Sequence, residues 1–359
     1  MVDQTHLYSL GAGPTVKLAD LPAFGVCGWS GSGKTTLIEA VIPHLRKQGL
    51  KVAVVKRTTH EIAADSPGKD SDRFFRAGAD VLLQGPDEGL FRSQDAAYPG
   101  LTSSLRSLSA HYDLVLVESY SGSPLPKVWL QDPSESAVPT TVQGVVASLS
   151  RDCDRAQSLL SILNEWLPLQ WEETPVFGCV LIGGKSRRMG YPKHLIQKNG
   201  KTWIQRTVEL LEQTTSQVAI VGGESEMANC VHLADVPDLR GPMAGVLAAM
   251  RWAPHVSWLV VACDLPLLSL PSLEWLLSTR SPGVWATLPR LQEPGRHIES
   301  LLAHYDYRTR QLIEDLAIEG DFSLSHLGSH EKVITPAPPP ALEPAWQDVD
   351  TPAQLEQVG

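Results

Sequence analysis

Residues 28–35 read Gly-Trp-Ser-Gly-Ser-Gly-Lys-Thr and match the phosphate-binding motif GxxxxGK(S/T) in full. In such a loop the glycines let backbone N–H groups turn toward phosphate oxygens, the lysine neutralises the β and γ phosphates, and the hydroxyl offers an oxygen to Mg²⁺. A plain glycine turn would need neither the lysine nor the threonine. We therefore predict a nucleotide site made by Gly28, Gly31, Ser32, Gly33, Lys34, Thr35 and Thr36.

A later apolar run, residues 114–118, ends in the carboxylate of Glu118. A carboxylate in this position can hold Mg²⁺ or orient a metal-bound water, but it can also be an ordinary solvated strand end. Because the phosphate loop is already present, we predict that Thr35 and Glu118 hold Mg²⁺. His60 and the segment 68–71 (Gly-Lys-Asp-Ser) could read a substrate or a guanine base, although alone they cannot be told from a surface loop.

A second glycine-rich segment, residues 183–190, has a different design and carries Lys185, Arg187 and Arg188, with Lys193 shortly after it. Guanidinium groups bind phosphate in a bidentate manner, and an anionic ligand relieves the repulsion between clustered cations. The alternative is a basic surface turn. The preceding apolar run and the paired glycines favour a second phosphate-binding site.

Length, charge and cysteine usage limit the class of protein. The chain has 359 residues, enough for two domains, and a net charge of −10, which indicates neither nucleic acid nor an acidic membrane as a partner. Its five cysteines form no CxxC pair, which favours structural thiols in a reducing compartment. No apolar run approaches the ~18 residues of a membrane span. We expect a cytoplasmic protein.

Short apolar runs alternate with amphipathic stretches, a rhythm that predicts parallel sheets with helical crossovers. In the first half the predicted strands are 24–27, 51–55, 81–83 and 114–117. An intervening helix has an apolar face and ends near Gly49, although Pro43 interrupts it. In the second half the predicted strands are 177–182, 217–221 and 258–263, with helices after Thr202, Pro242 and Pro271.

These patterns divide the chain into an N-terminal extension (1–21), a P-loop domain (22–168), a linker (169–175) and a second α/β domain (176–359). The segment 335–340 is too rich in proline for a helix or sheet, and we expect an extended spacer there.

The second half closely resembles the molybdenum cofactor guanylyltransferase family (MobA), and the first half resembles the molybdopterin-guanine dinucleotide biosynthesis adapter family (MobB). Residues 181–193 (LIGGKSRRMGYPK) are similar to the MobA signature LAGGxSxRMGxxK. The segments 241–245, 263–266 and 349–352 resemble its GPLAG, CDxP and VNTP blocks. The MobB resemblance is carried by residues 29–36, 68–71, 77–79 and 114–118.

The resemblance implies a P-loop NTPase-like parallel-sheet domain followed by a Rossmann-like, sugar-nucleotidyltransferase-like domain. The implied reaction transfers GMP from GTP to molybdopterin and releases pyrophosphate, with Mg²⁺ as the metal. Lys193, Arg188 and Asp264 would be catalytic, and Asp264 and Asp350 would hold the metal. The implied GTP site comprises Leu181, Ile182, Gly183, Gly184, Lys193, Asp235 and Asp264.

Taken without the resemblance, Asp264 could equally cap a helix, and Asp235 could equally be a turn residue before Pro237. The chain also departs from the family patterns: Asp350 stands in place of asparagine, Gly222 or Gly223 in place of a nucleotide-contacting asparagine, and Ser119 in place of glycine, while no proline follows His297.

Two other functions remain open at this stage: transfer of another nucleotide, such as CMP, or a non-catalytic GTP-binding scaffold for molybdoenzyme maturation. For the first half we expect a binding module with weak GTP hydrolysis and a delivery role, because its sequence shows no dedicated phosphoryl acceptor base. The resemblance implies partners among molybdopterin-loading proteins and molybdoenzyme maturation chaperones.

Overall fold

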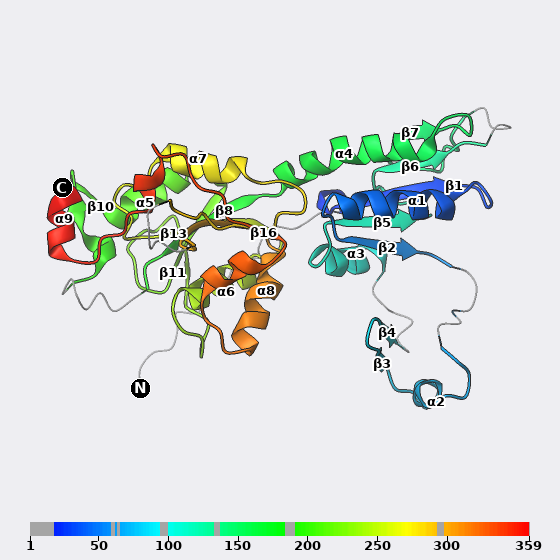
Figure 1. The fold of residues 1–359 in the computed structure, drawn as a ribbon, viewed down its shortest axis with the longest axis horizontal. Coiled ribbons are helices and arrows are strands. Elements are labelled where there is room, and N and C mark those ends of the chain that lie inside the picture. Colours follow the sequence, from blue (N-terminus) through cyan, green and yellow to red (C-terminus); the bar gives the residue numbers. More distant parts are fainter. Residues whose placement is uncertain are drawn as a thin grey trace. The chain divides into compact units, whose positions relative to one another are not determined.

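The computed structural model describes residues 18–58, 62, 65–93, 100–132, 137–183, 191–292 and 298–358. The chain divides into two compact units (Figure 1). One unit consists of Leu21–Gln48 and Val52–Leu160. The other consists mainly of Ser161–Gly359.

The core of the first unit is a five-stranded parallel sheet with strand order β2-β5-β1-β6-β7. Its strands are β1 (Ala23–Gly28), β2 (Val52–Lys56), β5 (Leu114–Glu118), β6 (Lys127–Leu130) and β7 (Val145–Leu149). The predicted parallel sheet is therefore present. Helices α1 (Lys34–Lys47) and α3 (Leu101–Ser109) pack on it.

Helix α1 has the apolar face that its sequence predicts, because Leu37, Val41 and Leu45 are buried against the sheet. The helix continues through the exposed Pro43 and is followed by Gly49 at φ 83°, a left-handed conformation that glycine adopts at little cost.

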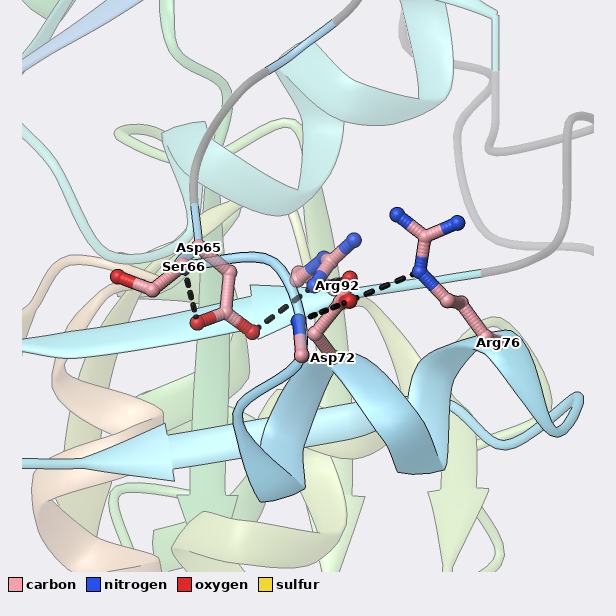
Figure 2. Close-up of polar contacts among 6 residues, drawn as sticks. Asp65, Ser66, Asp72, Arg76 and Arg92 are labelled. Atoms are coloured by element: carbon pink, nitrogen blue, oxygen red, sulfur yellow. Dashed lines mark hydrogen bonds and ion pairs between the residues drawn. The ribbon is translucent and has the colours of Figure 1, made fainter.

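The prediction that residues 81–83 belong to the parallel sheet is wrong. Strand β3 (Val81–Gln84) pairs antiparallel with β4 (Gly89–Arg92) in a separate hairpin next to α2 (Asp70–Arg76). Asp72 accepts hydrogen bonds from the backbone N–H of Gly68 (2.9 Å) and from Arg76 (2.8 Å), which hold its pKa below the usual range. Arg92 donates to Asp65 at 2.9 Å (Figure 2).

This polar cluster explains the local structure of the segment 68–71. An apolar run as short as 81–83 fits a hairpin as well as a central strand. Here β3 pairs with β4, and Arg92 of β4 forms ion pairs with Asp65 and Asp72. His60, the other residue suggested as a base reader, lies outside the described residues.

The second unit contains a seven-stranded mixed sheet with order β12-β11-β8-β13-β15-β14-β16. Strands β12, β11, β8 and β13 run parallel, whereas β15 is antiparallel to both of its neighbours. The strands are β8 (Val176–Leu181), β11 (Gln217–Val221), β12 (Val231–Leu233), β13 (Ser257–Ala262), β14 (Ala286–Thr287), β15 (Leu302–Tyr305) and β16 (Val333–Ile334), with a small hairpin of β9 (Gln197–Lys198) and β10 (Lys201–Thr202).

Two helical layers cover this sheet (Figure 1). Alternate residues of the central strands enter opposite cores, so that Cys179 and Val260 pack with α6 while Val180 and Val261 pack with α5 and α7. The helices are α5 (Trp203–Leu211), α6 (Pro242–Trp252), α7 (Leu270–Ser278), α8 (Thr309–Ile318) and α9 (Pro352–Val358), with 3₁₀ turns η2 (Lys193–Leu195), η3 (Leu324–Ser329) and η4 (Glu343–Trp346). Residues 335–339 have no helix or strand, as predicted for the proline-rich spacer.

The two units divide within helix α4 (Arg155–Glu173), because one ends at Leu160 and the other resumes at Ser161. Most of the segment 169–175, expected as a linker, is therefore the last part of this helix, which continues past Pro168. The segment is held there because Leu167 and Trp171 are buried and Arg280 donates to the backbone oxygen of Thr174 at 2.9 Å.

All five cysteines are free thiols. In the part of the chain that the structure describes, no helix combines the length and the apolarity that crossing a membrane requires.

His304 on β15 is a buried titratable group with an unusual environment. It is 1% exposed, and among the described residues neither ring nitrogen has a hydrogen-bond partner. Burial, with a contribution from the nearby charge of Arg280, lowers its pKa from 6.5 to about 3. Below pH 6.5 the unfolded chain therefore binds a proton that the folded chain excludes.

We predict that stability falls as the pH is lowered from 6.5 toward 3, with a contribution from His304 of about 1.5 kcal/mol between pH 6.5 and pH 5. The variant His304→Leu should lose this part of the pH dependence because it has no group to titrate. Urea unfolding of both proteins at the two pH values measures the difference. Equal pH dependence in the two proteins would contradict the prediction.

Candidate functional site

The phosphate-binding loop connects β1 to α1 in the way that its motif requires. Gly31 (φ 74°) and Gly33 (φ 94°) take left-handed conformations, and a Cβ on Gly28 would lie 2.6 Å from the Ser32 hydroxyl. Only glycine fits these positions at low cost. Lys34 folds back over the loop and donates to the carbonyl oxygens of Gly28 (3.0 Å) and Trp29 (2.7 Å).

The predicted metal ligands of this loop lie in contact. The Thr35 hydroxyl donates to Glu118 Oε2 at 3.1 Å. The Lys56 ammonium lies 3.2 Å from Glu118 Oε1 and donates to Thr35 Oγ1 at 3.2 Å. Lys56 and Glu118 are paired residues at the carboxyl ends of the adjacent parallel strands β2 and β5.

Arg155, the first residue of α4, fastens the loop to the sheet. Its guanidinium donates to the carbonyl oxygens of Ser32 (2.9 Å), Gln131 (2.7 Å) and Leu149 (2.9 Å), which come from the loop and from the ends of β6 and β7. The guanidinium thus ties the loop to the carboxyl ends of two strands.

The chain after Glu118 is held in an uncommon conformation. Ser119 (φ 78°) and Tyr120 (φ 59°) are both left-handed, although neither is glycine. The Cys27 thiol donates to the Ser119 carbonyl at 2.9 Å, and the buried Lys127 ammonium donates to the carbonyl oxygens of Ser123 and Gln143. Burial lowers the pKa of Lys127, which makes these acceptors necessary for its charge.

In the second unit the candidate residues follow parallel strands at one edge of the sheet. Gly183 follows β8, Gly222 follows β11, Asp235 follows β12 and Asp264 follows β13. The carboxyl ends of parallel strands are where ligands of open α/β sheets bind. The topology therefore brings these four residues to the same end of the sheet, and a ligand site there stays a prediction.

Glycines surround the Asp235 carboxylate closely. A Cβ on Gly183, Gly222 or Gly245 would lie 3.5, 3.2 or 3.3 Å from its oxygens. Gly222 also has φ 91° and packs against the backbone of Gly183. Partial burial raises the pKa of Asp235. Asp235 as a whole residue is nevertheless exposed.

Lys193 contacts both of the carboxylates that are predicted to hold the metal. Its ammonium donates to Asp264 Oδ2 at 2.8 Å and to Asp350 Oδ1. Asp350 is brought to this place because the Val349 N–H donates to the Asp264 carbonyl oxygen at 3.1 Å. Burial lowers the pKa of Lys193, but the hydrogen bonds of the two carboxylates outweigh this effect and the net shift is upward. The lysine is therefore charged.

For the remaining residues of the predicted GTP site the structure gives less detail. The side chains of Leu181 and Ile182 are buried, and the Ile182 N–H donates to the carbonyl oxygen of Val221. These two residues therefore border the carboxyl ends of the strands with their backbone alone. Gly184 and Arg188 lie outside the described residues, as do Lys185, Arg187 and His297.

Comparison with known proteins identifies the two halves. A family model described as MobA-like NTP transferase domain matches residues 178–333, and one described as molybdopterin guanine dinucleotide synthesis protein B (MobB) matches residues 23–150. A protein of Pelotomaculum thermopropionicum named "Probable molybdenum cofactor guanylyltransferase" is 36% identical over 38% of this chain and 67% of its own length. A molybdopterin-guanine dinucleotide biosynthesis adapter protein of Haemophilus influenzae is 31% identical over 41% of this chain and 90% of its own length. The chain belongs to the MobB and MobA families.

The predicted fusion and its α/β fold class are thereby confirmed. A molybdenum cofactor biosynthesis bifunctional protein of Synechocystis is similar as well, with 37% identity over 32% of this chain and 35% of its own length.

Sequence reasoning missed two residues of the MobB-like domain, Lys56 and Arg155. Lys56 could have been found from its place at the end of a predicted strand, because that end must lie beside the end of the Glu118 strand in a parallel sheet. Arg155 carries no such signal, since its partners in the loop and strands are far away in the sequence.

The left-handed Ser119 generates a stability prediction. We expect Ser119→Gly to raise the free energy of unfolding of the MobB-like domain by about 1 kcal/mol, because glycine adopts this conformation without the Cβ strain. Chemical denaturation followed by circular dichroism measures the change. Ser121→Gly is the matched control: Ser121 does not have a positive φ, so the same substitution there should be neutral or destabilising. A destabilised Ser119→Gly protein would refute the expectation.

Proposed function

We propose that the MobA-like domain transfers GMP from GTP to the terminal phosphate of molybdopterin and releases pyrophosphate. The convergence of Lys193, Asp264 and Asp350 at the carboxyl edge of the sheet is the observation that carries the proposal. The names of the relatives, a molybdenum cofactor guanylyltransferase among them, supply the choice of substrates.

In the proposed reaction a phosphate oxygen of molybdopterin forms a bond to the α-phosphorus of GTP. The bond from that phosphorus to the oxygen shared with the β-phosphate breaks, and pyrophosphate leaves with the electron pair. The attacking phosphate is already anionic near neutral pH, so the domain needs no general base. Its task is to hold two anions in line and to offset their repulsion.

Lys193 is suited to this task because its ammonium is charged and partly buried, with a side chain that is 13% exposed. Partial exclusion of water strengthens its attraction for a phosphate oxygen. Arg188 is proposed to add a second positive charge from the basic segment that follows β8.

Asp264 and Asp350 are the side chains that would hold Mg²⁺. Carboxylate oxygens are the ligands this ion prefers, and it commonly takes one or two of them together with substrate phosphates. Among the described residues no group of three or more His, Cys, Asp or Glu side chains forms a metal site, which fits an ion completed by substrate. When bound, Mg²⁺ would neutralise phosphate charge.

Asp235 is the proposed reader of guanine. A carboxylate can accept hydrogen bonds from both N1–H and the 2-amino group of guanine, a donor pair that cytosine and uracil lack. The glycines around Asp235 add no side chain beside its carboxylate. This assignment favours GTP over CTP as the substrate.

For the MobB-like domain we propose binding of Mg²⁺ and GTP at the loop of residues 28–35, with slow hydrolysis and a delivery role. Thr35 and Glu118 would hold the metal, and Lys34 would contact the phosphates after leaving the carbonyl oxygens that it now contacts. Partners of this domain are proposed among molybdopterin-loading proteins and the chaperones that mature molybdoenzymes.

We predict that Asp264→Asn lowers GMP transfer by about 100-fold or more, because the amide loses the negative charge that holds the metal. The full chain is incubated with molybdopterin, Mg²⁺ and GTP labelled at the α-phosphate, and labelled product and pyrophosphate are followed. Asp348→Asn is the matched control, since this exposed aspartate lies close in sequence to Asp350.

The same assay with labelled CTP and UTP tests the nucleotide. Transfer from CTP alone would reject the guanine assignment. Binding of GTP without transfer from any nucleotide would favour a non-catalytic scaffold.

A second prediction separates the two domains. Lys34→Ala should abolish release of the γ-phosphate, because the loop loses its contact with the β and γ phosphates, yet leave GMP transfer unchanged within about twofold. Phosphate release and labelled GMP transfer are measured on the same preparation. Loss of both activities together would contradict independent sites.

A further inference from the structure

Lys56 lies where the sequence predicts a metal ion in the MobB-like domain. Its ammonium contacts Thr35 Oγ1 and Glu118 Oε1, each at 3.2 Å, and these are the two side chains expected to hold Mg²⁺. The three groups close a triangle because the Thr35 hydroxyl also donates to Glu118 Oε2.

The burial of Glu118 explains why a cation is needed there. The Glu118 side chain is 9% exposed, and a carboxylate removed from water needs a partner of opposite charge. Lys56 supplies this opposite charge from the surface of the domain, because its side chain is 54% exposed. The carboxylate is thus fixed inside the domain, whereas the lysine can move into solvent at little cost.

The same oxygens suit Mg²⁺. Neighbouring ligands of an octahedral Mg²⁺ at ~2.1 Å lie about 3 Å apart, and Thr35 Oγ1 lies 3.1 Å from Glu118 Oε2. Thr35 Oγ1 would have to serve both cations, because it already accepts from Lys56. An ammonium held against the same carboxylate would also repel a divalent cation that binds beside it.

We propose that Lys56 is a place-holder cation: it neutralises Glu118 while the loop is empty and must be displaced before a divalent metal binds. This inference rests on the proposed binding of Mg²⁺ and nucleotide by the loop. Free metal alone must displace the lysine without compensation. A metal–nucleotide complex brings a phosphate that can receive the displaced ammonium, so metal and nucleotide bind synergistically.

The test measures Mn²⁺ binding to the full chain without nucleotide, by the loss of the free-ion EPR signal. Lys56→Met keeps the length of the side chain and removes its charge. Lys47→Met, at an exposed position of α1, is the matched control for the change in net charge. The double variant Lys56→Met with Glu118→Gln removes the proposed ligand, and the MobA-like domain contributes the same background to every variant.

The affinity of this site for Mn²⁺ should rise about tenfold in Lys56→Met, so that over the same range of Mn²⁺ concentration this variant binds one more ion per chain than Lys47→Met. Glu118→Gln should abolish this gain, and Lys56→Arg, which retains a cation, should show none. Circular dichroism melting checks that each variant is folded. A Lys56→Met titration that superimposes on that of Lys47→Met would overturn the proposal, as would a gain that survives Glu118→Gln.

Calorimetric titration of the unmodified chain and of Lys34→Ala with GTP and Mg²⁺ tests the underlying function separately. If the unmodified chain binds no GTP beyond what Lys34→Ala binds, the proposed function of the loop fails. If the loop binds GTP but Lys56→Met gains no metal site, only the place-holder role fails.

Discussion

In both halves of the chain a carboxylate at the carboxyl end of a parallel strand is neutralised by a lysine ammonium. Glu118 follows this pattern with Lys56, and Asp264 follows it with Lys193. Under the proposed functions the strand end places a carboxylate beside the phosphates of a nucleotide, and the lysine offsets the charge of that carboxylate when no ligand is present. The rest of each site is arranged around this requirement.

The backbone around the two sites shows how closely the chain is packed there. Gly28 has no room for a side chain, and Gly183 and Gly222 approach each other through their backbones beside Asp235. Ser119 keeps a left-handed conformation that glycine would adopt more easily, and a thiol hydrogen bond from Cys27 helps to hold it. At Ser119 the contacts of the strand end, rather than the conformational preference of the residue, therefore set the backbone conformation.

Local patterns predicted much of this structure because the relevant interactions are local. The phosphate loop is contiguous, and buried strands such as β8 and β13 are apolar runs that can be read directly. A short apolar run does not specify the partner of its strand. Residues 81–84 pair with the next strand, β4, instead of joining the parallel sheet, and β15 pairs antiparallel with the distant β13. The role of Arg155 could not be predicted from a local pattern, because it binds carbonyl groups that only the fold brings together.

Charge compensation by lysine has a consequence for ligand choice under the proposed functions. Free Mg²⁺ would have to compete with an ammonium for the carboxylates, and a free triphosphate would have to separate that ammonium from its carboxylates. A metal–triphosphate complex satisfies both partners at once, because its cation replaces lysine on the carboxylates and its anion receives the lysine. Lys56 and Lys193 would thus favour the complex over either component, although one domain is proposed to act on the γ-phosphate and the other on the α-phosphate.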